Sequence, residues 1–220
     1  MAKKDKNNNL TPKDHPAFLL LLFFFSGFVG LCYQVIWTRE LSVLFGKTNA
    51  AITVVVSVFM LGLGLGSLSW GKKNLDPGNL SKTFSFLQFG TAAGSLILLL
   101  AFPFLSRIYQ SLVLQLNLSP TLGLIFIFLL VSVLMFIPTF LMGGTFPVIS
   151  QLYIRTESKL GKGIGLLYGI NTFGGILGAL MTGYFLIGWL GQRETQGVGI
   201  VLNILIGTWF LLKGGWQPQP

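Results

Sequence analysis

Long apolar stretches separated by short polar connections fill nearly all of this chain of 220 residues. A helix needs about 20 predominantly apolar residues to cross the hydrocarbon core of a bilayer, which is roughly 30 Å thick. Only helices and closed barrels satisfy their backbone polar groups in lipid, and barrel strands alternate in polarity instead of running continuously apolar. The stretches therefore predict an all-α, polytopic integral membrane bundle.

Length and hydropathy place six spanning helices in the chain, and a charged fraction of only 10% agrees with this prediction. A single transmembrane domain is expected over residues 17 to 212, between a disordered basic tail at 1 to 16 and a short tail at 213 to 220. The six helices are predicted at 17 to 37, 49 to 70, 83 to 105, 121 to 146, 163 to 189 and 196 to 212.

The Lys and Arg residues gather on alternate connections between these helices, which sets an orientation. With the N-terminus in the cytoplasm, eleven of the 15 lie inside and only Arg39, Lys47, Arg107 and Arg193 lie outside. Both termini are therefore predicted to be cytoplasmic, in a bacterial inner membrane. The net charge of +9 follows from this topology and from contact with anionic lipid, so binding to nucleic acid is not expected.

The acidic residues and the single histidine do not form a catalytic or metal-binding pattern. All of them fall in tails, connections or helix ends, and no pair has ligand spacing. The sequence therefore predicts no catalytic residue, no metal site and no cofactor. The residues concerned are Asp5, Asp14, His15, Glu40, Asp76, Glu157 and Glu194.

Glycines recur at a spacing of four residues within the apolar stretches. In a membrane helix this spacing produces a ridge of small residues that lets a neighbouring backbone approach closely. The ridges predict a tightly packed bundle. They comprise Gly62 with Gly66, Gly90 with Gly94, Gly161 with Gly165 and Gly169, and Gly174 with Gly178.

Two of the predicted helices carry residues that interrupt helical hydrogen bonding. The fourth contains Pro138 and Pro147, and the first contains Gly27 and Gly30. Six helices also divide into two groups of three, and an odd number per group makes the second group inverted. Broken helices at equivalent positions of inverted repeats indicate the midplane binding site of a transporter. The alternative is that these residues simply bend helices for packing, and both interpretations stay open.

Polar side chains are few inside the spans, so they are the candidates for a site. They either line a polar cavity or bond between helices. With their neighbours, the candidate cavity or packing residues are Tyr33, Gln34, Trp37, Arg39, Glu40, Pro138, Thr139, Gly143, Thr145, Pro147, Tyr168, Asn171 and Thr172.

Four blocks in the chain resemble the membrane domain of bacterial spermidine synthase-like proteins, which are often labelled as fusions of a major facilitator and a spermidine synthase. The likeness covers residues 17 to 212. The blocks are SGFVGLCYQVIWTRELSVLFG (Ser26 to Gly46), FMLGLGLGSLSWGKK (Phe59 to Lys73), PTFLMGGTFPVIS (Pro138 to Ser150) and LLYGINTFGGILGALMTGYFLIGWLG (Leu166 to Gly191).

In that family the membrane helices typically precede a cytoplasmic aminopropyltransferase-like domain. The present sequence has no counterpart of that domain, so the resemblance carries no catalytic residue over to it. The resemblance instead implies a membrane pattern, made of Tyr33, Gln34, Trp37, Thr38 and Arg39, the segment from Pro138 to Pro147, and Tyr168, Asn171 and Thr172.

Three functions follow as hypotheses. The leading one is a non-catalytic membrane module that binds or moves a small solute, with a polyamine-like solute suggested by the resemblance, or that acts with a separate protein partner or a second copy of itself. The first alternative is a structural subunit of a larger membrane complex. The second is the membrane anchor of a split aminopropyltransferase, which would dock on Lys72, Lys73, Arg155 and Lys159.

Overall fold

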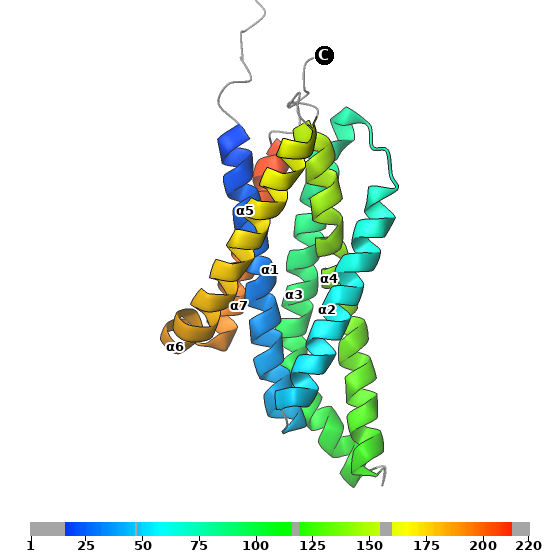
Figure 1. Cartoon of the computed structure of the whole chain (residues 1–220). Helices are drawn as coiled ribbons and strands as arrows, with labels where there is room; N and C mark the ends of the chain where they lie inside the picture. The colour runs from blue at the N-terminus through cyan, green and yellow to red at the C-terminus, as the bar shows by residue number, and fades with distance from the viewer. Residues whose placement is uncertain (1–15, 47, 116–118, 155–159, 213–220) are drawn as a thin grey trace, which may run out of the picture.

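The computed structural model describes residues 16–46, 48–115, 119–154 and 160–212, and within these ranges the chain is helical (Figure 1). Six helices are long and apolar enough to cross a membrane. The prediction of an all-α, six-helix polytopic bundle is therefore confirmed. The elements are α1 (Pro16–Phe45), α2 (Thr48–Gly71), α3 (Pro77–Leu114), α4 (Pro120–Ile154), α5 (Leu160–Met181), a π-helical turn (Thr182–Leu186), α6 (Ile187–Leu190) and α7 (Gln192–Leu212).

Several helices are longer than predicted. The first was expected to end near residue 37 but continues to Phe45. Its polar residues fit within the helix because the Thr38 hydroxyl donates to the Gln34 carbonyl at 2.7 Å, and the Ser42 hydroxyl donates to the Thr38 carbonyl at 2.7 Å. Such hydroxyl bonds to the preceding turn let polar residues extend a helix instead of ending it.

Pro138 and Pro147 predict that the second half of the fourth helix is kinked or partly unwound, and the structure corrects the unwinding. α4 remains helical through Pro138 and Pro147. The Thr139 hydroxyl donates to the Met135 carbonyl at 2.9 Å, and the Thr145 hydroxyl donates to the carbonyl three residues earlier at 2.6 Å. These hydroxyls bond other carbonyls than the ones four residues before each proline, so α4 continues through both prolines without their replacing the missing backbone bonds.

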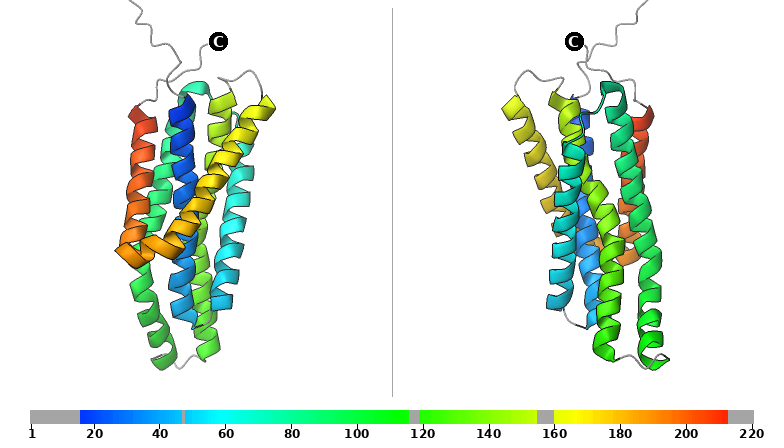
Figure 2. Two further views of the ribbon diagram at one scale, coloured as in Figure 1. Left: turned by 60° about the vertical axis from the view of Figure 1, so that its left-hand side comes forward. Right: turned by 90° about the vertical axis from the view of Figure 1, so that its right-hand side faces the viewer.

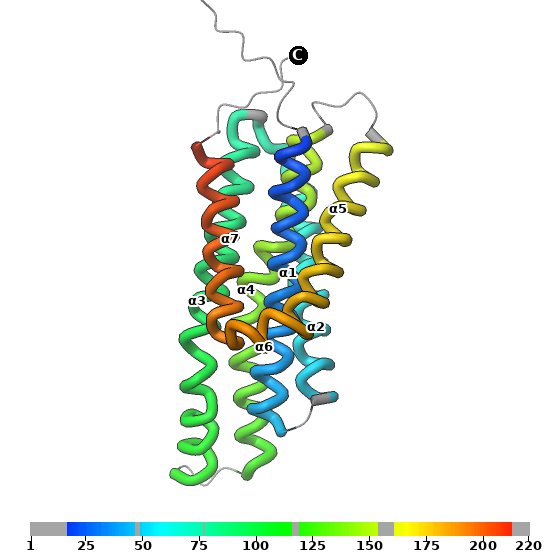
Figure 3. Tube along the Cα trace, turned by 90° about the vertical axis from the view of Figure 1, so that its left-hand side faces the viewer, coloured from blue at the N-terminus to red at the C-terminus, as the bar shows by residue number. Residues whose placement is uncertain are grey.

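The first helix is also continuous through Gly27 and Gly30, whereas the fifth span is the one that changes geometry. Its helix widens into the π-helical turn at Thr182–Leu186, and the chain then reverses at Gly191. Gly191 has a φ of 95°, a conformation that favours glycine. The turn at Gly191 lies well short of the level that the α3–α4 hairpin reaches (Figure 3).

The helices pack in an order that matches two inverted groups of three. α2 packs along α4, and α5 packs along α1 in the corresponding way. α3 lies against α4 and α7, while α7 also lies against α1 (Figure 2). Each of the first three helices runs opposite to its equivalent in the second group. This arrangement supports the expectation of two inverted three-helix repeats.

Glycines at the two main crossings strengthen this correspondence. A Cβ added to Gly66 on α2 would collide with the backbone carbonyl of Phe140 on α4. A Cβ on Gly178 of α5 would collide with the backbone carbonyl of Phe28 on α1. The two glycines, Gly66 and Gly178, are separated along the chain by the same number of residues as the two carbonyl residues that they face, Phe140 and Phe28. The same close helix crossing therefore occurs once in each repeat.

One predicted glycine ridge does not pack within the chain. A Cβ at Gly161, Gly165 or Gly169 would meet no described atom within 4 Å. The reason is that α5 crosses α1 near Gly174 and Gly178 and leans away from it toward its own first residue (Figure 3). The prediction of close packing is therefore wrong for this ridge.

Two clusters of buried apolar side chains follow one another along the bundle. One lies toward the end where α1 begins and α7 ends, called the terminal end here, and includes Phe23 and Phe84. The other lies toward the opposite end, called the far end, and includes Trp37, Phe59 and Met135. On each of α1, α3, α4 and α7, the residues between the two clusters include polar ones.

Candidate functional site

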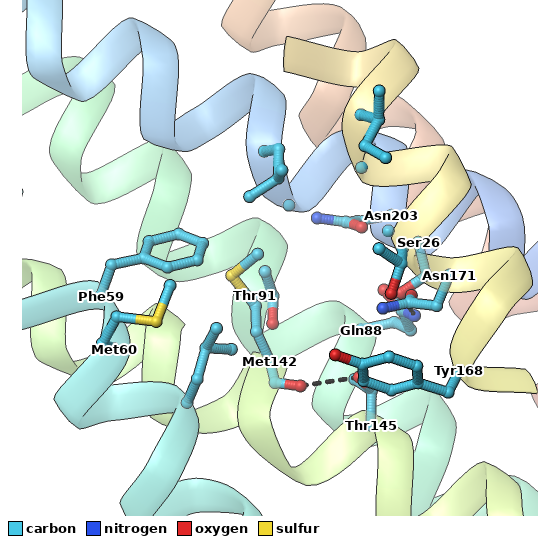
Figure 4. A pocket seen from close by; sticks show the side chains of 17 residues that line it. Ser26, Phe59, Met60, Gln88, Thr91, Met142, Thr145, Tyr168, Asn171 and Asn203 are labelled. Carbon is cyan, nitrogen blue, oxygen red and sulfur yellow. Dashed lines mark hydrogen bonds between the residues drawn. The ribbon is translucent and has the colours of Figure 1, made fainter. Parts of the chain in front are cut away.

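A crevice of about 310 Å³ lies at the level between the two apolar clusters. α1, α3, α4 and, through Asn203, α7 form its floor, and α2 and α5 form its two walls (Figure 4). Its lining is Ser26, Gly27, Gly30, Leu31, Phe59, Met60, Leu63, Gln88, Thr91, Met142, Thr145, Tyr168, Asn171, Thr172, Gly175, Ile176 and Asn203. None of these residues carries a charge.

The crevice opens sideways, between its two walls. In the described part of the chain, no Cα atom of α2 comes within 8 Å of a Cα atom of α5. The residues at the lips are exposed at the side of the bundle, with Met60 at 52%, Ile176 at 49% and Tyr168 at 64%. In a bundle that spans a bilayer, the sides of the helices face lipid. The mouth therefore faces the membrane interior.

Hydrogen bonds between helices fix part of the crevice floor. The Gln88 amide donates to the Ser26 hydroxyl at 2.9 Å, which joins α3 to α1. The Asn203 amide donates to the Tyr33 hydroxyl at 3.1 Å, which joins α7 to α1. By contrast, no described residue forms a hydrogen bond with the side chain of Asn171, which borders the crevice from α5. Its amide nitrogen can therefore donate to a ligand, whereas its Oδ1 lies against Gly27 of α1.

Four of the residues singled out in the sequence line this crevice, namely Thr145, Tyr168, Asn171 and Thr172. Thr145 comes from α4 and the other three come from α5, so residues far apart in the sequence meet at one space. All four lie near a glycine in the sequence, and such small residues allow the helices to approach closely around a cavity.

The candidates on α1 lie elsewhere. Tyr33 and Trp37 are fully buried and stack with their ring centroids 5.4 Å apart, in the apolar cluster toward the far end. Gln34 is half-buried and does not line the crevice. Arg39 is exposed, while Glu40 is half-buried beside Gln192 and Arg193 near the turn into α7.

The remaining candidates on α4 contact neighbouring helices. Pro138 lies against Gly94 of α3, and Thr139 lies against Gly62 of α2. Gly143 faces the backbone of Leu63, and the Pro147 ring lies 3.7 Å from where a Cβ of Gly71 would stand. These four residues, Pro138, Thr139, Gly143 and Pro147, therefore serve helix packing in the structure.

The sequence does not single out Ser26 or Thr91 as cavity residues. Gln88 and Asn203 are among the few polar residues within apolar spans, which either line a polar cavity or bond between helices, and both line the crevice. What the sequence lacks is the rotation of each helix about its axis, because packing against neighbours sets that rotation. Only the structure brings these residues from α1, α3 and α7 to one space.

The proposed docking patch is described only in part. Lys72 and Lys73 are exposed after α2, and the Lys73 ammonium lies 3.9 Å from the centre of the Trp70 ring. Arg155 and Lys159 lie outside the described residues. Docking of a partner enzyme on these four residues therefore stays a prediction.

The bond between Asn203 and Tyr33 should contribute little to stability. Hydrogen bonds between membrane helices are worth about 0.6 kcal/mol on average, and about 1 kcal/mol shifts the melting temperature of a chain of this size by about 2 to 4 °C. Tyr33→Phe is expected to lower Tm in detergent by about 2 °C, with the exposed Tyr184→Phe as the control. A fall of about 10 °C would show that the hydroxyl has a larger role.

No family model, no curated protein and no solved structure matches this chain. The resemblance to the membrane part of spermidine synthase-like proteins stays a prediction from the sequence. What the chain does must therefore be argued from the crevice itself.

Proposed function

We propose that this chain is a non-catalytic, multi-pass module of a bacterial cytoplasmic membrane that binds a small solute in the crevice between α2 and α5. The crevice is the observation that supports this function. Its volume of about 310 Å³ falls in the range of small-molecule sites, and its lining combines apolar walls with a few convergent polar groups. Placement of both termini in the cytoplasm rests on the distribution of Lys and Arg.

The repeat organisation supports movement of the bound solute as well as binding. Transporters built from inverted repeats hold their substrate near the bilayer midplane, where the two repeats meet. Here α1 and α4 are the first helices of the two repeats, and both contribute to the crevice floor. Rocking of α2, α3 and α4 against α1, α5 and α7 would change the side from which the crevice is reached and would keep the close crossings of α2 with α4 and of α5 with α1.

The uncharged lining favours an uncharged solute over a polyamine. A polyamine carries several ammonium groups, and burying each of them requires a compensating charge or a dense set of acceptors. The crevice lining contains no Asp or Glu. Its amides and hydroxyls suit neutral donors and acceptors instead.

A thiol in the crevice tests whether the site admits a small molecule. In a Cys32→Ala background, Ser26→Cys should react with N-ethylmaleimide, because Ser26 lines the crevice. The matched control is Ser95→Cys, whose side chain is fully buried outside the crevice and should stay unreacted. Labelling is counted by intact-protein mass spectrometry in membranes.

Equal and negligible labelling of the two thiols would contradict the proposed function, because the crevice would then be closed to a small solute. Where Ser26→Cys reacts, protection by added solutes identifies the class that binds. Spermidine should give no protection. Clear protection by spermidine would instead place a polyamine in the crevice and would overturn the argument from its neutral lining.

A further inference from the structure

The crevice described above is reached from the membrane, and we infer that its ligand is an uncharged amphiphilic lipid that enters between α2 and α5. This inference rests on the proposed function and specifies the ligand of the same site. The lipid would place a hydroxyl-bearing head group on the crevice floor while its hydrocarbon chains remain in the bilayer.

One pair of aromatic rings lies at each end of the crevice along the bundle axis. Toward the terminal end, the rings of Phe146 and Tyr168 meet with centroids 6.1 Å apart and connect α4 to α5. Toward the far end, the rings of Trp37 and Phe59 meet with centroids 6.4 Å apart and connect α1 to α2. The gap between α2 and α5 is the open side of the crevice, so a molecule in the bilayer can reach the floor through that gap.

Polarity changes from the mouth to the floor. Near the mouth, Met60, Leu63 and Ile176 supply most of the wall surface beside Tyr168 and Thr172, whereas Gln88 and Thr91 are buried on the floor. A molecule with an apolar chain and a small polar head matches this gradient when its head points inward. The chain then stays in contact with lipid, so only the head and the adjoining methylene groups have to fit within about 310 Å³.

The same lining selects against charged head groups. A phosphate on the floor would lose its hydration without meeting a Lys or Arg, because none lines the crevice. A hydroxyl or ester head instead finds the amides of Gln88 and Asn171. Diacylglycerol is therefore a suitable probe, and phosphatidic acid with the same chains is its charged counterpart.

The experiment uses the full chain in nanodiscs that contain a photoreactive diacylglycerol, with its diazirine next to the ester. We expect adducts on α2 and α5 around the mouth, with a yield about tenfold above that of the matching phosphatidic acid analogue. Ile176→Trp should fill the mouth and lower the yield about fivefold or more, because an overpacked opening excludes a chain. Ile164→Trp, an exposed residue of α5 outside the crevice, should leave the yield unchanged.

Equal yields for the two analogues, or adducts spread over all lipid-facing helices, would overturn the inference. If Ser26→Cys reacts with N-ethylmaleimide but no crevice adduct forms, the solute site stands and its ligand is water-soluble. If Ser26→Cys is also unreactive, the proposed function itself fails. A cross-link between two chains through their α5 helices near Ile176 would also overturn the inference, because a second copy would then cover the mouth.

Discussion

Replacing Gly178 by valine is expected to lower the melting temperature by about 5 to 10 °C and to reduce the yield of monodisperse protein. Overpacking costs about 1 to 3 kcal/mol, and each kcal/mol shifts Tm by about 2 to 4 °C in a chain of this size. The upper part of this range applies because the added atoms would meet the backbone carbonyl of Phe28, which cannot move away by changing rotamer. Scanning fluorimetry in detergent provides the measurement.

Gly169→Val is the matched control, since it makes the same substitution in the same helix at a position where a Cβ meets nothing within 4 Å. We expect its Tm to change by less than about 2 °C, as for substitutions that disturb no contact. Gly66→Val should behave like Gly178→Val, because Gly66 occupies the equivalent crossing of the other repeat. Equal losses at Gly169 and Gly178 would show that helix propensity, and not the crossing, causes the effect.

Replacing Asn171 by leucine is expected to reduce diacylglycerol adducts about tenfold without loss of folded protein. Leucine has the same branching and number of side-chain heavy atoms as asparagine but offers no donor or acceptor, and leaving a buried polar group of the ligand unpaired costs about 1 to 3 kcal/mol. A factor of ten corresponds to about 1.4 kcal/mol, which lies within that range. The Asn171 side chain bonds no described residue, so the substitution removes no hydrogen bond of the protein, but Tm must be followed because Asn171 packs against Gly27 of α1. Adduct yield and Tm are measured on the same preparation.

Gln34→Leu provides the comparison for Asn171→Leu. Gln34 is also an amide within a span and is half-buried, but it lies outside the crevice lining. Its replacement should leave the adduct yield unchanged. If both substitutions lower the yield by the same factor, the effect belongs to the polarity of the bundle in general and not to the crevice.

The six spans and their order were predictable because hydrophobic length alone specifies a membrane helix. The ends of the spans were not. Thr38 and Arg39 are polar residues that suggest an exit from the membrane, yet α1 continues past them because helical geometry can satisfy polar side chains at its outer end. Hydropathy indicates where lipid contact ends, which need not coincide with the end of a helix.

The proline and glycine signals were only partly informative. Proline removes one backbone donor, but a membrane helix can continue through it, as α4 does at Pro138 and Pro147. The π-helical turn at Thr182–Leu186 had no comparable signal. Glycine spacing predicted the crossing at Gly178 correctly, but the same spacing at Gly165 faces away from the bundle.

The candidate site was also only partly predictable, because the sequence shows which residues are polar but not what they contact. Thr145 and Asn171 are candidates because they are polar residues within spans, and both line the crevice. Tyr33 and Trp37 are candidates because they belong to a polar segment of the first helix, but both lie in the core. A polar side chain in a span must have some partner, and the sequence does not distinguish a partner within the protein from a ligand.

The unequal lengths of the helices have a consequence for the surrounding lipid. α7 contains 21 residues and α3 contains 38, which correspond to about 32 Å and 57 Å at 1.5 Å per residue. A flat bilayer of uniform thickness matches the α5–α7 edge but not the α3–α4 edge. The membrane should therefore be thinner beside α7 than beside α4, or the whole bundle should tilt, each at a cost of a fraction of a kcal/mol per Å of mismatch. The length of the lipid acyl chains should therefore influence the tilt of this protein in its membrane and the choice of molecules that lie beside each edge of the bundle.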